Sequence, residues 1–238
     1  MGDKMNPLSI VYSCYNSQEM IIFSLNHYRT YKDKYLDNLE FLIVDDGSNP
    51  PLLIDGTGLN LKHLRIKEEI PWNQGGAKNL GTIQASNDWI LYLDADRIIP
   101  TETLDFLFNN IEKGHYYLFA QINFDGSSRG TKKPFGVFCA EKSEMLKVKG
   151  FDERFCGTYG YEDLQLSKKL KVGKVQKVKL NDKYLIAYDT IMDGKVKNLS
   201  RDLKRNKELF TKSRRERYAF KYSLWLNFDW ELSNIWTR

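Results

Sequence analysis

The stretch that decides the fold is residues 89–96, which read Trp-Ile-Leu-Tyr-Leu-Asp-Ala-Asp. A short apolar run of this kind is typical of a strand that is buried on both faces, as in a parallel sheet covered by helices. Two carboxylates, Asp94 and Asp96, follow the run directly. In open α/β sheets, ligands bind outside the carboxyl ends of the strands. The stretch therefore predicts a buried strand and a ligand site at its end.

Two earlier apolar runs end in polar clusters in the same way. Residues 8–13 lead into a cluster that contains Ser13 and Tyr15, and residues 39–44 lead into Asp45-Asp-Gly-Ser. Because the carboxyl ends of parallel strands meet at one edge of a sheet, we expect these clusters to lie beside the two carboxylates above. A site is therefore predicted from three separate segments.

Helical patterns separate the apolar runs. We expect helices at 18–32, 75–86, 102–113 and 161–171, and further strands at 63–67, 116–124, 135–140 and 184–188. Alternation of strands and helices at this spacing predicts an α/β fold, with a Rossmann-like, mostly parallel central sheet and helices on both faces.

Asp94 and Asp96 have a chemical reason to stand together. Neighbouring carboxylates repel each other, and a divalent cation relieves that repulsion. Mg²⁺ typically takes one or two carboxylates together with phosphate oxygens, so the pair predicts a metal that bridges to a diphosphate. The alternative is a polar strand exit that caps a helix. Asp45 likewise is placed to accept hydrogen bonds from a base or a ribose, or it serves an ordinary turn.

A glycine-rich turn at residues 73–79 leads into a predicted helix and contains Lys78. Such a turn admits a ligand close to the backbone and offers helix N-terminal N–H groups to an anion. An ordinary loop is the alternative. The turn lacks the Walker signature, so an ATP-cleaving P-loop is not supported.

Two adjacent acids, Glu162 and Asp163, follow glycines and tyrosines at the start of a predicted helix. They are either favourable charges at a helix N-terminus or chemical groups. A sugar hydroxyl that attacks an anomeric carbon needs a positioned carboxylate base. In that interpretation Asp163 is the base, Glu162 holds the acceptor, and Tyr159 or Tyr161 offers a stacking face to a sugar.

Together, these motifs resemble the inverting family-2 glycosyltransferases of the GT-A fold. The resemblance covers about residues 7–190, with motifs in the family's order at 9–16, 44–48, 73–96 and 149–166. The last motif is similar to the acceptor-side motif shared by chondroitin-polymerase and galactosyltransferase-type enzymes.

The resemblance implies a reaction and a set of roles. A sugar would pass from a nucleotide-diphosphate donor, a UDP-hexose or UDP-N-acetylhexosamine, to the hydroxyl of a glycan or other acceptor, in one displacement with inversion. The implied residues are Ser13, Tyr15, Asp45 and Lys78 for the nucleotide, Asp94 for the ribose or metal, Asp96 for Mn²⁺ or Mg²⁺, and Asp163 as the general base.

Two departures from the family pattern stand out. Lys78 occupies a position where Arg is frequent, and the two side chains differ in planar recognition. Many relatives also supply a late His as a metal ligand, whereas no His follows His115 here. Asp189 is the best substitute, as a harder oxygen ligand.

Two other functions remain open at this stage. A sugar-1-phosphate nucleotidyltransferase has a related sheet, but usually shows a glycine-rich loop with Arg and Lys after its first strand. Here residues 14–17 read Cys-Tyr-Asn-Ser. A catalytically silent nucleotide-sugar or glycan-binding module is the second alternative.

The C-terminal part differs in charge from the rest. The chain has a net charge of +5, of which residues 195–217 carry +7 and the remainder −2. We therefore expect a GT-A domain at 1–194 and a basic, aromatic, helical extension at 195–238. The extension is either a solvated helix face or a contact to a membrane surface, a nucleic acid or a partner subunit.

No apolar run approaches the roughly 20 residues that span a bilayer. Residues 1–7 also lack the apolar region of a signal peptide. The expected location is cytoplasmic, with a peripheral membrane contact as a possibility of the basic extension.

Overall fold

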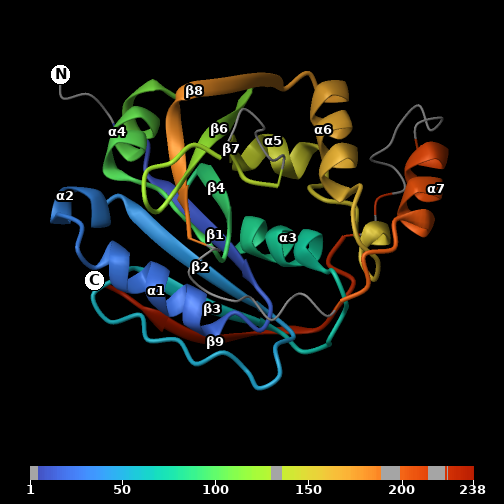
Figure 1. The fold of residues 1–238 in the computed structure, drawn as a ribbon, viewed down its shortest axis with the longest axis horizontal. Coiled ribbons are helices and arrows are strands. Elements are labelled where there is room, and N and C mark those ends of the chain that lie inside the picture. Colours follow the sequence, from blue (N-terminus) through green and yellow to red (C-terminus); the bar gives the residue numbers. More distant parts are fainter. Residues whose placement is uncertain (1–4, 130–135, 189–198, 214–222, 224) are drawn as a thin grey trace.

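The computed structural model describes residues 5–129, 136–188, 199–213, 223 and 225–238. Figure 1 shows a central twisted sheet with helices packed around it. The strands are β1 (Leu8–Cys14), β2 (Leu39–Asp46), β3 (Leu61–Ile66), β4 (Trp89–Asp94), β5 (Arg97–Ile98), β6 (His115–Asn123), β7 (Phe138–Glu141), β8 (Gln176–Ala187) and β9 (Trp230–Trp236). The helices are α1 (Gln18–Tyr28), α2 (Asp33–Leu36), α3 (Gln74–Gln84), α4 (Thr101–Asn110), α5 (Lys142–Lys147), α6 (Glu162–Val172) and α7 (Lys204–Ser213), with a 3₁₀ turn η1 at Glu153–Phe155.

The sheet has the strand order β5-β8-β6-β7-β4-β1-β2-β3-β9. Strands β4, β1, β2 and β3 are parallel neighbours, as the apolar runs predict. All eight residues of β2 are buried, which agrees with a strand covered on both faces. Beyond β4 the sheet is mixed, because β7 runs antiparallel to both β4 and β6.

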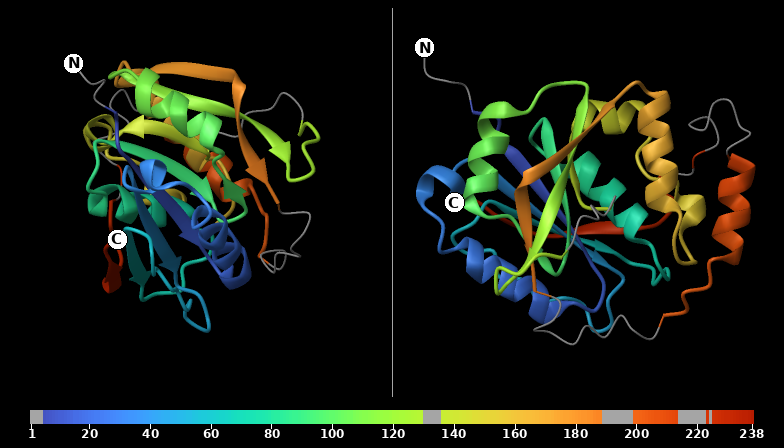
Figure 2. Two further views of the ribbon diagram at one scale, coloured as in Figure 1. Left: turned by 90° about the vertical axis from the view of Figure 1, so that its left-hand side faces the viewer. Right: turned by 45° about the horizontal axis from the view of Figure 1, so that its top comes forward.

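Helices cover both faces of the sheet, which confirms the predicted α/β architecture. Alternate residues of the central strands, such as β1 and β4, enter two separate cores. The first core lies under α1 and α4 and includes Ile21 and Leu104. The second lies under α3, α5 and α6 and includes Leu80 and Leu166. The two further views in Figure 2 show the same two layers of helices.

The C-terminal end contains a strand that the sequence analysis did not predict. Helix α7 confirms helical structure in part of the extension, but β9 joins the edge of the main sheet antiparallel to β3. A β-bulge interrupts this pairing between His63 and Leu64. Because one extra residue reverses the faces of a strand, Trp230 packs on the second core and Trp236 on the first.

Two expectations concern residues that lie outside the described ranges. The division at residue 194 stays a prediction, because residues 189–198 lie outside them. Residues 214–222, which the sequence predicts to be part of the basic helical extension, also lie outside the described residues. Among the helices that the structure describes, none is both long and apolar enough to cross a membrane.

Helix α3 approaches β1 very closely at Gly81. A Cβ atom on Gly81 would overlap both methyl groups of Val11, and both residues are fully buried. This close approach sets the position of the helix that carries Gln74 and Lys78.

We expect Gly81→Ala to lower the free energy of unfolding by about 1–3 kcal/mol, because overpacking forces the helix away from the sheet. This loss outweighs the gain of ~1 kcal/mol that Ala brings over Gly in a helix. Urea unfolding of the single variants Gly81→Ala and Val11→Ala and of the double variant measures the effect. The two substitutions should couple favourably. A Gly81→Ala protein as stable as the wild type contradicts this packing.

Candidate functional site

The parallel register brings three strand ends together. Ser13 of β1 is the direct partner of Asp94 of β4, and Cys14 of β1 is the partner of Asp45 of β2. The polar clusters that the sequence places after three separate strands therefore share one edge of the sheet. Their position agrees with the expectation, and their roles stay predictions.

Asp45 is fully buried and already has partners within the protein. Its carboxylate accepts hydrogen bonds from the N–H groups of Ser48 and Leu52, at 2.9 and 3.1 Å. It also pairs with the guanidinium of Arg65 from β3. These bonds fix the turn after β2. Arg65 was not predicted, because it lies on a different strand and matches no motif.

The neighbouring Asp46 is also buried, and it contacts Asn73 at the start of α3. One of its oxygens accepts a hydrogen bond from Asn73 Nδ2 at 2.8 Å. Burial raises the pKa of the Asp46 carboxyl to about 7. The side-chain oxygen of Asn73 is buried and has no partner among the described residues. The signal for this pair was the second acid of the Asp-Asp-Gly-Ser cluster.

Two other predicted nucleotide contacts lie at the end of β1. The Ser13 hydroxyl is buried without a hydrogen-bond partner in the described part of the chain. The Tyr15 hydroxyl donates to Glu69 Oε1 at 2.5 Å, which raises the pKa of Tyr15. Glu69 lies in the loop after β3, so this bond spans the turn after β2 and holds Tyr15 beside the same edge of the sheet.

Lys78 lies between the strand that carries Asp94 and the helix that carries Asp163. It is fully buried, its ammonium donates to the carbonyl of Gly136 at 2.8 Å, and it lies 3.4 Å from Asp94 Oδ1. Gln74, one turn earlier on α3, donates to the same Asp94 oxygen at 2.6 Å. A Cβ on Gly136 would lie 3.1 Å from Asp163 Oδ2 and 3.4 Å from Lys78 Nζ. The buried ammonium of Lys78 therefore lies beside the carboxylate of Asp94 on β4 and near that of Asp163 on α6.

Glu162 and Asp163 are the first two residues of α6. One oxygen of each, Glu162 Oε2 and Asp163 Oδ1, is buried without a hydrogen-bond partner among the described residues. Burial, followed by the Asp163 charge, raises the pKa of Glu162 to about 7. Burial also raises the pKa of Asp163, against the opposite effect of Lys78. Buried oxygens with raised pKa values suit a group that gives or takes a proton.

Buried tyrosines position the turn that carries Asp94 and Asp96. The hydroxyl of Tyr12 donates to the carbonyl of Arg97 at 2.7 Å, and that of Tyr188 donates to the carbonyl of Ala95. Tyr12 comes from β1, whereas Tyr188 follows β8 directly. These tyrosines belong to apolar patterns in the sequence, so their polar function was not predicted.

The predicted metal ligands fit part of a coordination shell. The side chains of Asp94 and Asp96 are 34% and 20% exposed, and Asp96 lies 2.5 Å from Arg97 Nη1. The described residues contain no group of three or more His, Cys, Asp or Glu side chains that could hold a metal ion. Asp189 lies outside them. Two accessible carboxylates suit a cation whose other ligands are phosphate oxygens.

The predicted acceptor tyrosines face other rings. Tyr159 packs on Trp72 with ring centroids 4.7 Å apart, and Arg201 lies over both rings. Tyr161 packs on Phe210 of α7, at 5.4 Å. The C-terminal segment therefore contacts the acceptor-side motif directly.

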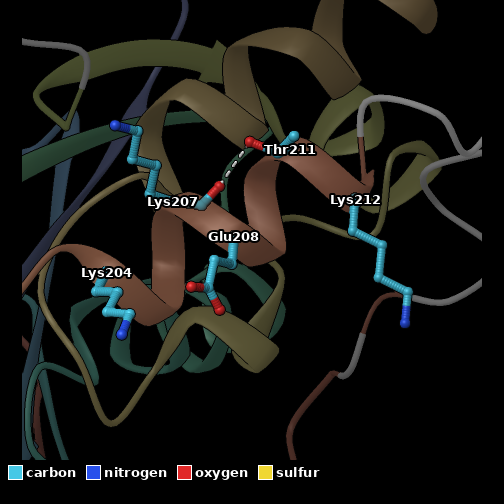
Figure 3. Close-up of a pocket in the computed structure, with 5 residues that line it drawn as sticks. All are labelled: Lys204, Lys207, Glu208, Thr211 and Lys212. Carbon is cyan, nitrogen blue, oxygen red and sulfur yellow. Dashed lines mark hydrogen bonds between the residues drawn. The ribbon is translucent and has the colours of Figure 1, made fainter.

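A separate hollow of about 550 Å³ lies on α7. Figure 3 shows its lining residues, Lys204, Lys207, Glu208, Thr211 and Lys212, all carried by this one helix. None of them belongs to the strand ends described above. Part of the predicted basic surface therefore lies around this hollow on α7.

Comparison with known proteins identifies relatives of both sequence and fold. Glycosyltransferase GlyG from Streptococcus pneumoniae serotype 4 is 27% identical over 132 residues, which cover 50% of this chain and 40% of GlyG. The structure of residues 1–349 of Staphylococcus aureus TarS in complex with UDP-GlcNAc matches 85% of this chain and 64% of that one, with a TM-score of 0.65 and 18% identity.

The structure of GalNAc-T7 with UDP, GalNAc and Mn²⁺ matches 78% of this chain and 44% of that one, with a TM-score of 0.59 and 16% identity. These two structural likenesses show a GT-A fold. The chain spans less than two thirds of the length of each of the three relatives. The family described as Glycosyl transferase family 2 matches residues 9–161. Because this match covers more than half of the chain, the protein belongs to glycosyl transferase family 2.

Proposed function

We propose that the chain transfers a sugar from a UDP-sugar to an acceptor hydroxyl, with inversion at the anomeric carbon. Membership of family 2 supports the transferase class. The observation that carries the proposal is the cluster formed by Asp94, Lys78, Asp163 and Glu162, in which buried carboxylate oxygens lack partners among the described residues. Such a cluster, at the edge where α/β sheets bind ligands, suits proton transfer beside a charged substrate.

In this proposal, Asp163 takes the proton of the acceptor hydroxyl while that oxygen attacks the anomeric carbon. The new bond forms as the bond between the anomeric carbon and the diphosphate oxygen breaks, and its electron pair leaves with UDP. Glu162 holds the acceptor beside the base, and Tyr159 or Tyr161 faces the acceptor sugar. No covalent nucleophile is needed.

The donor binds at the strand ends. Ser13, Tyr15 and Asp45 surround the nucleotide, and Lys78 adds a positive charge. Asp46 is a further candidate, since the side-chain oxygen of its partner Asn73 is buried without a hydrogen-bond partner among the described residues. UDP is the proposed nucleotide, and a hexose or N-acetylhexosamine the proposed sugar, by analogy with the TarS complex with UDP-GlcNAc.

A divalent cation, Mn²⁺ or Mg²⁺, is proposed to bind between Asp94, Asp96 and the diphosphate, with Asp189 as a third protein ligand. When bound, the cation offsets the negative charge of the leaving diphosphate. The GalNAc-T7 structure contains Mn²⁺. The residues of this chain orient the donor and supply the base.

The basic surface of α7 is proposed to contact an anionic partner, either a membrane surface on the cytoplasmic side or a nucleic acid. Lys204, Lys207 and Lys212 place three positive charges around one hollow. A solvated helix face is the alternative. Co-sedimentation with phosphatidylserine vesicles tests the membrane contact, and a gel-shift assay with DNA tests the nucleic-acid contact. If the wild type and the variant in which all three are Gln bind equally in both assays, the solvated helix face is supported.

The donor is identified by nucleoside-diphosphate release from a panel of nucleotide-sugars in the presence of Mn²⁺. We expect one UDP-sugar to support release in the wild type. Asp96→Ala should reduce the rate about 100-fold or more, because charge stabilisation by a metal is worth several kcal/mol. Asp182→Ala, which removes a carboxylate with a 78% exposed side chain, is the control and should keep the wild-type rate. Pyrophosphate release from a nucleoside triphosphate and a sugar phosphate would instead indicate a nucleotidyltransferase.

The pH dependence of transfer tests the role of Asp163. Because a general base must be ionised, kcat/KM should rise with pH through the raised pKa of Asp163. Lys78→Met removes the neighbouring positive charge that lowers the pKa of Asp163, so it should shift this rise to higher pH. Asp163→Asn should lower the rate about 10²–10⁴-fold.

Donor binding by Asp163→Asn, measured by calorimetry, controls for misfolding. A pH profile that stays in place in Lys78→Met, or moves to lower pH, contradicts the assignment of Asp163 as the base.

A further inference from the structure

One side chain of α7 holds the loop that leads into the proposed base. Asn206 is fully buried, although its neighbours on α7, Arg205 and Lys207, are exposed. Its Nδ2 group donates to the carbonyls of Phe155, Thr158 and Gly160, at 2.8, 2.9 and 2.8 Å.

These carbonyls belong to the last residue of η1 and to the irregular loop between η1 and α6. Backbone carbonyls outside helices and strands still need hydrogen-bond donors when they are buried. A single amide from a segment some fifty residues later supplies them. Asn206 Oδ1 also accepts a hydrogen bond from the Thr158 hydroxyl, at 3.2 Å. The conformation of this loop is therefore coupled to α7.

Arg205 contacts the same loop from the solvent side. Its Nη1 donates to the Cys156 carbonyl at 3.0 Å and to the Thr158 hydroxyl at 2.6 Å. Its Nη2 donates to the carbonyl of Arg154 at 3.0 Å. Hydrogen bonds from a charged donor are stronger than neutral ones. Together, Asn206 and Arg205 donate to five backbone carbonyls, and both side chains also contact the Thr158 hydroxyl.

Apolar contacts extend this attachment towards α6. Leu203 lies against Gly160, where a Cβ atom would come within 2.7 Å of its Cδ2. Gly160 has a φ of +86° and Tyr161 a φ of +72°, so the chain turns sharply just before Glu162. Lys168 of α6 also donates to the carbonyl of Ser213 at the end of α7, at 2.7 Å. Figure 1 shows α7 beside α6.

We propose that Asn206 is a positioning residue for the acceptor half of the reaction. By holding residues 154–160, it fixes where Tyr159, Glu162 and Asp163 stand. The predicted donor contacts lie on β1, β2, β4 and α3, and none of them takes part in these hydrogen bonds. The inference rests on the proposed function, and it assigns α7 a role in the use of the acceptor.

The test compares Asn206→Leu and Arg205→Met with the wild type, using UDP-GlcNAc as donor and p-nitrophenyl glycosides as acceptors. Leu removes the donated hydrogen bonds at similar volume, and Arg205→Met is an exposed change that leaves the core intact. Thr30→Val is the matched control, because it removes one exposed side-chain hydrogen bond, to the carbonyl of His27 in α1, and does not touch the loop.

We expect Asn206→Leu to lower kcat/KM for the acceptor about tenfold or more, because small displacements of catalytic groups are costly. Arg205→Met should act in the same direction, more weakly. The affinity for UDP-GlcNAc, measured by calorimetry, should stay within about twofold in both variants. Amide hydrogen exchange of residues 154–161 should rise in both, and Thr30→Val should behave as the wild type.

Unchanged acceptor kinetics in both variants overturns the proposed role. A loss of donor affinity by the same factor as the loss of transfer also overturns it, since that indicates general destabilisation. A wild-type protein that releases UDP from no donor contradicts the proposed function instead. Hydrogen exchange needs no activity, and unchanged exchange at residues 154–161 in both variants overturns the attachment itself.

Discussion

The buried ammonium of Lys78 is the interaction on which the candidate site depends. It lies between Asp94 on β4, the carbonyl of Gly136 and the neighbourhood of Asp163 on α6. A buried charge costs several kcal/mol unless partners surround it, so α3 must sit close to the sheet and to α6. Gly81 permits this approach at β1. The packing of α3 and the electrostatics of the site are therefore coupled, because a displacement of α3 also separates Lys78 from Asp94.

This arrangement divides the proposed reaction between two parts of the fold. The ends of the parallel strands, with α3, form the side proposed for the donor. The loop before α6 carries the side proposed for the acceptor, and the C-terminal segment holds it. Lys78 touches both sides, so its charge lowers the pKa of Asp163 while burial raises it. The net effect is a pKa above the ordinary value of an aspartate, as suits a group that takes a proton.

The sequence predicted the parallel strands and their shared edge because buried strands are continuous apolar runs, and the register follows from their alignment. Strand β9 escaped prediction for a physical reason. It is an edge strand with mostly exposed residues, and a bulge places Trp230 and Trp236 on opposite faces, so no regular alternation is visible. The partners of Asp45 and of the acceptor loop, Arg65 and Asn206, were not predicted either. Each is a contact between segments distant in sequence, which no local pattern encodes.

The central claim is that the strand ends and the carboxylates around Lys78 form one nucleotide-sugar site. A crystal structure of the protein with UDP-GlcNAc and Mn²⁺, recorded at a wavelength where manganese scatters anomalously, tests it most directly. The account predicts an anomalous peak beside Asp94 and Asp96, with the uracil at the ends of β1 and β2 and the sugar facing Asp163. A nucleotide bound elsewhere, for example in the hollow of α7, with no manganese at Asp94 or Asp96, would contradict it.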